Sequence, residues 1–583
     1  MVISATESIT RTADRRPALR KRTTPARAAD VLIDVLHKAG VRAIFGLPGG
    51  AIAPLNDALL DRTDVRVVTT RHEAGAMFAA CGYARATEQV AVVMVTSGPG
   101  VLNCMTGLAS AFCDGLPVLL IAGEVPRNVF GKGALQEGSS YNLNIVGMAK
   151  HITKLALEAT DPNNAPSFLR RALATAAAGR QGPVLLSLPF DISVAQIIRP
   201  GLAGEATVKS SIDEGLVAKV AVTLENAKRP VIFAGAGSRW GHGPERLRHL
   251  AERLQIPVMT TPKAKGVFPE SHRLSLGVFG FGGHPSAREY LEAGTDVLLA
   301  VGTGLGDAAT DGWSDLLRPS EHLIQIDTDA LRIGRSYPVS VGLVGEAEFV
   351  LEQINRKLSP VLHRRTRTFG VRRYTDPSVA SPSARISTPR ALWELQQVLP
   401  VNTRYTCDMG DHLLFAAHYL EINDPQGFLI MIGLASMGSG IAGALGVKLA
   451  GPEHSVAAIV GDGCFAMSMG DLATAVHEKV PIVVAVINDG RYGMVERSNA
   501  NIYGRTPSYD CGQLDVAGVA RGLGADVLVI EQPGDLLRAD LARSPDRPLV
   551  LDIRVDSSIV MPRNKRFVGT TAPGCGKALE SVK

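Results

Sequence analysis

Two acidic turns in the last third of the chain carry the side chains best suited to binding a metal ion. The first is Gly461-Asp-Gly463 and the second is Asn488-Asp-Gly490, and each follows a strand-length apolar run. The 24 residues of 464–487 that separate them are about enough for one βαβ crossover. Such a crossover brings both turns to one edge of a parallel sheet, where the carboxylates of Asp462 and Asp489 can meet a single cation.

Magnesium suits this arrangement, because it binds few protein carboxylates and fills its octahedral shell with phosphate oxygens. Gly461 and Gly463 let the main chain approach a phosphate group, and a helix that starts near Cys464 offers N–H groups to an anion. The Gly-Asp-Gly sequence by itself is equally consistent with an ordinary tight turn. The paired motif at this spacing favours a site for Mg²⁺ and a phosphorylated ligand.

Three further stretches contain candidate functional residues, each with a plain structural alternative. Glu73 opens a helix with a small, apolar face, although a Glu in a first turn commonly serves only as a partner of the helix dipole. Met437 stands before glycines in the stretch 433–442, where a Met is more often a filler of the core. His412 ends the polar turn 408–412, and a histidine in that position is equally suited to the surface.

Together these motifs resemble those of the thiamine-diphosphate enzymes, the superfamily of pyruvate decarboxylase and acetolactate synthase. The resemblance extends from about residue 26 to 560 and is greatest for the large subunit of acetolactate synthase. It implies that the side chains of Asp462 and Asp489 bind Mg²⁺ and that the main-chain carbonyl of Arg491 is a third ligand. Many relatives have Asn in place of Asp489, but either side chain offers an oxygen, and the extra charge favours the cation.

The resemblance also implies roles around the coenzyme, thiamine diphosphate. Glu73 is expected to hydrogen-bond the N1′ atom of the aminopyrimidine, which promotes the imino tautomer that deprotonates the thiazolium C2 atom. Met437 is expected to be the apolar wedge beneath the coenzyme that forces its V shape, and the turn 408–412 is expected to help hold the diphosphate. The expected coenzyme-binding residues are Met409, Asp411, His412, Ala435, Met437, Gly461, Gly463, Cys464 and Met494.

Two loops of the first segment match those that face the substrate in acetolactate synthase. Gly50 and Ala51 are expected to orient a carbonyl oxygen, and Gln136 is expected to be a polar substrate contact. Decarboxylases that release aldehydes usually carry adjacent histidines nearby, but this chain has none between His72 and His151. Without this proton donor the product of decarboxylation can attack a second carbonyl. The chain is therefore expected to decarboxylate a 2-keto acid such as pyruvate and to join the acyl anion to an acceptor carbonyl.

Other functions stay open at this point. A non-oxidative 2-keto acid decarboxylase would release free aldehyde, and a non-catalytic thiamine- or nucleotide-binding protein is disfavoured because Glu73, Asp462 and Asp489 are all present. Two departures from acetolactate synthase leave open the acceptor and the binding of FAD, which those enzymes hold in the middle domain. The turn 301–307 lacks the Arg that holds the acceptor carboxylate, and Ser498 stands where a Trp selects 2-ketobutyrate.

The elements that must position these residues form three segments of alternating strands and helices. Short runs rich in Val, Ile and Leu, separated by helix-length segments, indicate βαβ crossovers and parallel sheets. The expected fold is α/β, with three doubly wound parallel-sheet domains. The expected ranges are 26–198 for the pyrimidine-binding domain, 212–355 for the central domain, 356–387 for a linker, 388–560 for the diphosphate- and Mg²⁺-binding domain, and 561–583 for a tail or lid.

Charge and composition argue against several other classes of protein. The net charge of +5 is small for 583 residues, and the basic residues of 1–25 are expected to form a disordered arm and not a nucleic-acid-binding module. The seven cysteines are scattered and contain no CxxC pair, so neither a disulfide framework nor a zinc site is expected, and a cytoplasmic location fits. No apolar run is long enough for a membrane span.

The resemblance finally implies that active sites are shared between copies of the chain. Glu73 lies in the first segment, whereas Asp462 and Asp489 lie in the third. In this family the coenzyme sits between the first domain of one subunit and the third domain of another. The chain is therefore expected to form a homodimer or homotetramer, with a 2-keto acid and a carbonyl acceptor as its small-molecule partners, and with neither nucleic acid nor membrane as a partner.

Overall fold

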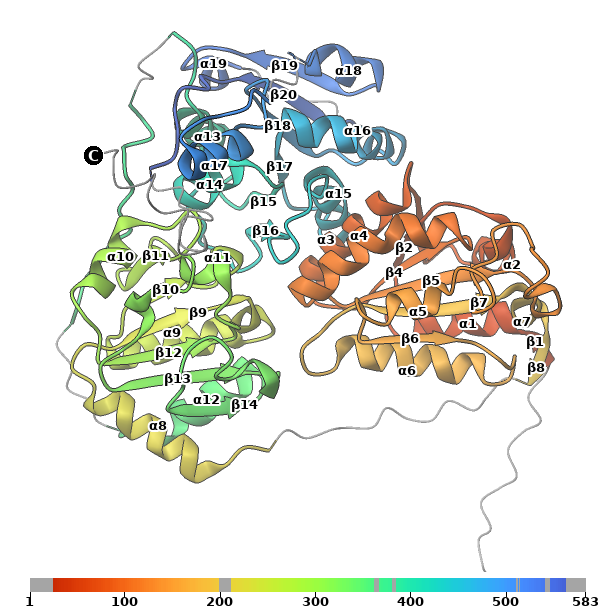
Figure 1. The fold of residues 1–583 in the computed structure, drawn as a ribbon, viewed down its shortest axis with the longest axis horizontal. Coiled ribbons are helices and arrows are strands. Elements are labelled where there is room, and N and C mark those ends of the chain that lie inside the picture. Colours follow the sequence, from red (N-terminus) through yellow and green to blue (C-terminus); the bar gives the residue numbers. More distant parts are fainter. Residues whose placement is uncertain are drawn as a thin grey trace, which may run out of the picture.

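The computed structural model describes residues 25–198, 211–360, 366–379, 384–509, 512, 514–539 and 546–562. The basic arm expected at 1–25 and the tail or lid expected at 561–583 lie outside the described residues, apart from Pro25, Met561 and Pro562. The described chain forms three α/β bodies, each built on its own six-stranded sheet (Figure 1).

The first domain contains a parallel sheet with the strand order β3-β2-β4-β5-β7-β6. Its strands are β2 (Ala43–Gly46), β3 (Arg66–Thr69), β4 (Ala91–Val95), β5 (Val118–Glu124), β6 (Leu155–Glu158) and β7 (Val184–Pro189). Its helices are α1 (Ala28–Lys38), α2 (Ala53–Leu60), α3 (Glu73–Thr87), α4 (Pro99–Asp114), α5 (Ile145–Ala149), α6 (Ala165–Ala177) and α7 (Phe190–Val194). A small antiparallel pair, β1 (Pro25–Arg27) and β8 (Gln196–Ile198), joins the two ends of the domain.

The second domain contains a parallel sheet with the strand order β11-β10-β9-β12-β13-β14. Its strands are β9 (Val231–Ala234), β10 (Val258–Thr260), β11 (Ser275–Val278), β12 (Val297–Val301), β13 (His322–Asp327) and β14 (Val341–Val344). Its helices are α8 (Glu214–Asn226), α9 (Gly243–Leu254), α10 (Pro285–Glu292), α11 (Asp307–Thr310) and α12 (Ala347–Lys357).

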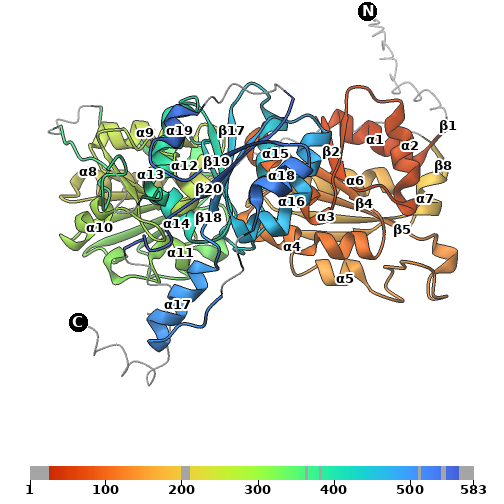
Figure 2. The same ribbon diagram turned by 90° about the horizontal axis from the view of Figure 1, so that it is seen from above.

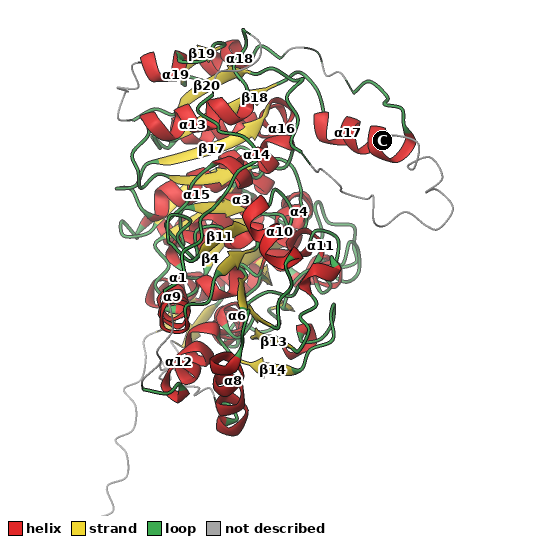
Figure 3. Ribbon diagram, turned by 90° about the vertical axis from the view of Figure 1, so that its left-hand side faces the viewer, coloured by secondary structure: helices red, strands yellow, loops and turns green. Residues whose placement is uncertain are grey.

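The third domain contains a parallel sheet with the strand order β16-β15-β17-β18-β20-β19. Its strands are β15 (Arg404–Cys407), β16 (Phe428–Ile430), β17 (Val456–Gly461), β18 (Val483–Asn488), β19 (Asp526–Ile530) and β20 (Leu549–Arg554). Its helices are α13 (Thr388–Val398), α14 (Asp411–Tyr419), α15 (Gly440–Ala450), α16 (Asp462–His477), α17 (Gly493–Tyr503), α18 (Val516–Gly522) and α19 (Asp535–Arg538). Of these helices, α17 projects from the body of the domain (Figures 2 and 3).

All neighbouring strands of the three sheets run parallel, so the predicted fold class is confirmed. Every residue of β4 and of β5 is buried, because helices cover both faces of the sheet. This burial explains why the strands read as continuous apolar runs and not as alternating patterns. In the part of the chain that the structure describes, every helix is too short or too polar to cross a lipid bilayer.

The first and third domains meet along two glycine-rich helices, α3 and α15, which lie side by side in Figures 1 and 2. A Cβ atom added to Gly446 would lie 1.9 Å from the carbonyl oxygen of Ala79, and one added to Gly82 would lie 2.2 Å from that of Gly443. Only glycine allows the two helix backbones to approach this closely. The crossing fixes α3, which begins at Glu73, against the third domain.

The second and third domains meet through buried polar groups. Lys265 and Glu270 form an ion pair whose side chains are shielded from solvent, and Glu270 also accepts the main-chain N–H of Ile422 at 3.1 Å. The imidazole rings of His284 and His418 stack across the same junction, with 4.7 Å between their centroids. These contacts fix the second domain against the end of α14 and the segment that leads from it to β16 in the third domain.

Candidate active site

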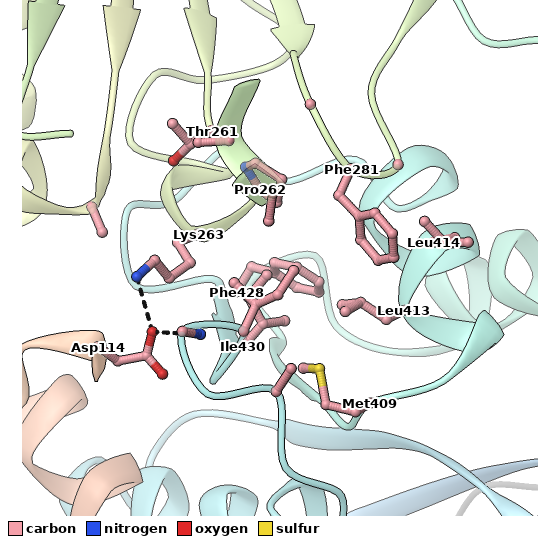
Figure 4. A pocket seen from close by; sticks show the side chains of 18 of the residues that line it. Asp114, Thr261, Pro262, Lys263, Phe281, Met409, Leu413, Leu414, Phe428 and Ile430 are labelled. Atoms are coloured by element: carbon pink, nitrogen blue, oxygen red, sulfur yellow. Dashed lines mark hydrogen bonds and ion pairs between the residues drawn. The ribbon is translucent and has the colours of Figure 1, made fainter. Parts of the chain in front are cut away.

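A cavity of about 1380 Å³ lies where the three domains meet. Figure 4 shows an apolar group at its centre, including Phe281, Met409 and Phe428, and a polar edge formed by Asp114 and Lys263. Twelve of the sixteen site residues expected from the sequence line this cavity, all of them from the third domain. They are Met409, Asp411, His412, Ala435, Met437, Gly461, Asp462, Gly463, Cys464, Asp489, Arg491 and Met494.

The two acidic turns lie at one edge of the third sheet, as their spacing predicts. The strands β17 and β18 that precede them are parallel neighbours, and Gly461 is in register with Ile487. Asp462 bridges the turns, because its carboxylate accepts the N–H of Gly463 and the N–H of Gly490, both at 2.9 Å. Asp489 lies beside Gly490 and faces the same cavity.

The two carboxylates are buried close together. Burial raises the pKa of Asp489 to about 7, and the charge of Asp462 acts in the same direction. Burial also raises the pKa of Asp462. Two buried carboxylates beside each other are electrostatically unfavourable, and a divalent cation removes that cost. The donor set therefore fits a hard cation such as Mg²⁺.

Such a cation needs further ligands beyond these two side chains. No group of three or more His, Cys, Asp or Glu side chains suited to a metal ion occurs among the residues that the structure describes. Magnesium commonly completes its shell with carbonyl oxygens, phosphate and water, so two carboxylates are enough. The side chain of Arg491 pairs with Glu496 at 3.5 Å, and the expected role of the Arg491 carbonyl as a third ligand stays a prediction.

Two helices begin at the cavity wall beside these carboxylates. The helix α14 begins at Asp411 and α16 begins at Asp462, two residues before the expected start near Cys464. The N–H groups of a helix N-terminus favour an anion. His412 lies between the two helix starts, since a Cβ on Gly461 would be 3.1 Å from its ring.

His412 is an unsatisfied polar group at this anion-binding end. Its Nε2 atom is buried and has no hydrogen-bond partner among the described residues. Burial lowers the pKa of His412 to about 4, so the ring is neutral near pH 7. A buried polar atom without a partner is costly unless a ligand supplies one. This observation fits a phosphorylated coenzyme in the cavity.

The loop that carries Ala435 and Met437 is held rigidly by a residue that the sequence did not single out. Asp408 is fully buried and its carboxylate accepts the N–H groups of Gly438 at 3.0 Å and Gly440 at 2.9 Å. The sequence feature that could have revealed Asp408 is its position as the first residue of the turn 408–412. Met437 packs against the apolar cores on both sides of the loop, which suits a side chain that supports a ligand from below.

The other expected coenzyme-binding residues have local structural roles as well. The thiol of Cys464 is buried and donates to the carbonyl of Met409 at 3.1 Å, and burial raises its pKa, so it is not a reactive nucleophile. Ala435 adopts a left-handed conformation with φ of 61°, which turns the chain sharply before Met437. Met494 packs on the core of the third domain.

The remaining four expected residues lie in the first domain and do not line this cavity. Glu73 is buried at the start of α3, and its Oε2 atom accepts a hydrogen bond from the Nδ2 atom of Asn103 at 2.9 Å. Asn103 lies on α4 and was not foreseen, although it follows closely after the glycine turn at the end of β4. Within one chain Glu73 thus does not line the cavity that contains the metal-binding turns.

The other three expected residues of the first domain lie near the carboxyl ends of its strands; they are Gly50, Ala51 and Gln136. Gly50 and Ala51 follow β2 in a short 3₁₀ turn, and Ala51 packs against Gly123, where an added Cβ would lie 2.7 Å from the Ala51 carbonyl carbon. Gln136 has a φ of 62°, and its carbonyl oxygen would lie 2.8 Å from a Cβ on Gly98. The roles expected for these three residues toward a substrate stay predictions.

The structure shows what surrounds the two positions at which the chain departs from the acetolactate synthase pattern. The turn after β12 has Gly304 in place of an arginine, but an added Cβ there would lie 2.8 Å from the Nη1 atom of Arg332 and 3.5 Å from the Nη2 atom of Arg335. Cationic charge is therefore supplied to this part of the cavity from the loop after β13, which the sequence pattern did not reveal. Ser498 is half-buried on α17 and is not part of the cavity wall.

Comparisons with known proteins decide the family. Residues 26–143 match the N-terminal TPP binding domain of the thiamine pyrophosphate enzymes, residues 217–354 match their central domain, and residues 408–553 match their C-terminal TPP binding domain. The chain belongs to the thiamine pyrophosphate enzyme family. The three matches coincide with the three sheets of this thiamine pyrophosphate enzyme, and residues of all three matched ranges line its cavity.

Several curated relatives are acetolactate synthases. The acetolactate synthase of Arthrospira platensis is 33% identical over 551 residues, which are 90% of this chain and 94% of the relative. The large subunit from Corynebacterium glutamicum is 34% identical over 567 residues (93% and 88%), and the isozyme 3 large subunit of Escherichia coli is 32% identical over 557 residues (91% and 95%). The chain is therefore a thiamine-pyrophosphate-dependent enzyme that resembles the acetolactate synthases.

A solved structure has the same fold. It is that of a proposed thiamin diphosphate-dependent enzyme isolated from Mycobacterium smegmatis, with a TM-score of 0.77 and 24% identity. The likeness covers 91% of this chain and 99% of that chain. At this identity it concerns the three-domain fold and not the chemistry.

Proposed function

We propose that this thiamine pyrophosphate enzyme decarboxylates a 2-keto acid, with pyruvate as the first candidate, and transfers the resulting acyl anion to an acceptor carbonyl. The observation that carries the proposal is the cavity wall of the third domain. There the buried carboxylates of Asp462 and Asp489 lie close enough to repel each other, and His412 presents an unsatisfied Nε2 atom at two helix N-termini. These are the groups that a magnesium diphosphate would satisfy.

In this proposal the third domain binds the charged end of the coenzyme. Asp462 and Asp489, with the carbonyl of Arg491, would hold Mg²⁺, and His412 would donate from Nε2 to an oxygen of the diphosphate. Met437 supports the coenzyme from the loop that Asp408 fixes. The bound coenzyme supplies the carbon nucleophile that attacks the 2-keto acid. The protein contributes orientation and the exclusion of water.

The first domain provides the acid–base group. Asn103 holds one carboxylate oxygen of Glu73, and the other oxygen, Oε1, would lie 3.6 Å from a Cβ on Gly100. Glycine at 100 thus leaves room beside Oε1, where Glu73 can share a proton with the aminopyrimidine ring. A proton shared at that point activates the coenzyme, and this is the step that a Gln in place of Glu73 cannot perform.

The site is complete only when a second copy of the chain is present. Within one chain Glu73 does not line the cavity that contains Asp462 and Asp489. We therefore propose a homodimer, or a dimer of such dimers, in which Glu73 of one copy faces the metal-binding turns of the other. Gly50, Ala51 and Gln136 approach the shared site with Glu73 and contact the 2-keto acid.

Product analysis tests the reaction. Purified protein with Mg²⁺, thiamine diphosphate and pyruvate is expected to release CO₂ and, with a panel of carbonyl acceptors, to give a new C–C bond that mass spectrometry detects. Free aldehyde without a new C–C bond would establish a simple decarboxylase instead, and no CO₂ from any 2-keto acid would refute the proposal. A visible absorption spectrum of the same preparation tests for bound flavin.

The variant Glu73→Gln separates an enzyme from a binding protein. It is expected to abolish CO₂ release while coenzyme affinity changes little, because the metal-binding turns and Met437 lie on another domain. Unchanged turnover in this variant would remove Glu73 from the mechanism.

A further inference from the structure

The helix α17 contacts the start of α14 at the cavity wall through one ion pair. Arg497, in the second turn of α17, pairs with Asp411, the first residue of α14, and both line the cavity. The pair packs on Gly493, where an added Cβ would lie 2.7 Å from Nη2 of Arg497 and 2.9 Å from Oδ2 of Asp411. The absence of a side chain at 493 therefore makes space for the pair.

Asp411 is expected to help hold the diphosphate through its backbone, whereas its side chain has a charge that opposes the proposed ligand. It precedes His412 at the helix start where the diphosphate is proposed to bind, and its side chain is only 13% exposed. Charges of like sign at close range in a poorly solvated site repel each other strongly, because little water screens them. An uncompensated carboxylate at 411 would thus cancel part of the attraction that the N-termini of α14 and α16 offer to an anion.

Arg497 is the cation that faces this carboxylate. Burial lowers the pKa of Arg497, but a guanidinium remains protonated at neutral pH, and its planar group suits a carboxylate. The neighbouring cation of the same segment, Arg491, is directed to Glu496. Neutralisation of Asp411 consequently depends on Arg497, whose own helix begins at Gly493, shortly after the turn that carries Asp489.

We propose that Arg497 is a positioning residue that neutralises Asp411 and thereby sets the affinity of the cavity for the diphosphate of the coenzyme. The inference rests on the proposed function, and it extends that function to a residue, Arg497, that was not expected to take part in coenzyme binding. Arg497 acts through Asp411 and not on the reacting atoms. Its loss therefore changes coenzyme affinity first and turnover at saturating coenzyme little.

A charge-neutralisation series on the full-length chain tests the proposal. The dissociation constant of thiamine diphosphate at saturating Mg²⁺ is measured by titration calorimetry and by the fluorescence of Trp240 and Trp313, which line the cavity. R497Q is expected to weaken binding by about tenfold or more. D411N is expected to bind at least as tightly as the native chain, and the double variant R497Q/D411N is expected to recover native affinity within about threefold.

Two further variants sharpen the test. R497K keeps the positive charge and is expected to bind within about threefold of the native chain. R538Q removes the arginine of another ion pair in the third domain, with Asp535, whose residues are not part of the cavity wall, and is expected to bind as the native chain does. If R497Q does not fold, as judged by circular dichroism, D411N and R497K decide the question.

The outcomes separate this inference from the proposed function. A native chain that binds neither thiamine diphosphate nor magnesium pyrophosphate overturns the proposed function itself. A native chain that binds the coenzyme, together with an unchanged R497Q, overturns only the role of Arg497. A double variant as weak as R497Q, an R497K as weak as R497Q, or a D411N that binds more weakly than the native chain also overturns it, because each shows that Arg497 does not act by neutralising Asp411.

Discussion

Asp462 accepts a hydrogen bond from the main-chain N–H of Gly490, with 2.9 Å between its Oδ2 atom and the nitrogen. This contact ties the turn after β17 to the turn after β18, so one proposed metal ligand fixes the position of the other, Asp489. The carboxylates of Asp462 and Asp489 are thereby held together before any cation arrives. Such a preformed site loses less conformational freedom when it binds Mg²⁺.

The charge of Asp489 is expected to make magnesium binding depend on pH. Its pKa of about 7 means that the carboxyl is partly protonated below neutrality, and Mg²⁺ must then displace the proton. Affinity should therefore rise from about pH 6 to about pH 8 and level off above that. The variant Asp489→Asn has no proton to lose, so its affinity should be weaker at high pH and nearly independent of pH. Titrations of Mg²⁺ at fixed coenzyme measure this, and equal pH slopes for both proteins would contradict it.

Mixed dimers test whether sites are shared between copies. Glu73→Gln and Asp462→Asn should each abolish activity in homodimers. A heterodimer purified through two different tags has one site with both defects and one site with neither, so about half of the native activity should return. If each site were built within one chain, every site of the heterodimer would carry a defect and no activity would return.

Asn103 is expected to orient Glu73 for catalysis. Asn103→Ala removes the donor to the Oε2 atom and should lower turnover by about tenfold while coenzyme affinity stays near the native value. Asn103→Asp places a second carboxylate beside Glu73 and should be more damaging than Asn103→Ala. The exposed Asn163 offers a matched control, since Asn163→Ala should leave turnover unchanged. A loss of coenzyme affinity that equals the loss of turnover would argue against an orienting role.

The junction between the second and third domains is expected to weaken in acid. His284 accepts the N–H of Val278 through Nδ1 at 2.9 Å, and His418 accepts the N–H of Tyr374 through Nε2 at 3.0 Å. In each ring an unprotonated nitrogen accepts a hydrogen bond from a main-chain N–H, so protonation of that nitrogen would break the hydrogen bond. Burial lowers the pKa of His418 to about 4 and lowers that of His284 well below its ordinary value, and the charges of Lys265 and Arg373 act in the same direction.

The sign of the effect follows from proton uptake. Between about pH 6.5 and pH 4 the unfolded chain binds protons at these histidines and the folded chain does not, so the free energy of unfolding falls as the pH falls. For His418 alone the loss approaches about 3 kcal/mol. Denaturant unfolding at several pH values measures the slope, which His418→Gln should reduce. The exposed His249 provides the control, and an unchanged slope in His418→Gln would contradict the assignment.

The sequence by itself determined the three parallel sheets and the two acidic turns of this protein. Buried strands such as β4 and β17 are marked by short apolar runs, and each turn follows directly after its strand, so local sequence order places Asp462 and Asp489 at one sheet edge. The same local order identified the loop of Met437 and the start of α3 at Glu73. These features depend on neighbours along the chain and on the geometry of one βαβ crossover.

Only the tertiary structure decided which distant side chains share a site. It brought Asn103 to Glu73, Asp408 to the loop of Met437 and Arg497 to Asp411, and it kept Glu73 out of the cavity of its own chain. It also placed Arg332 beside the turn that lacks an arginine. The physical reason is that such contacts depend on how helices cross and how domains pack. Side-chain volumes over the whole chain decide this packing together, so no local sequence pattern contains it.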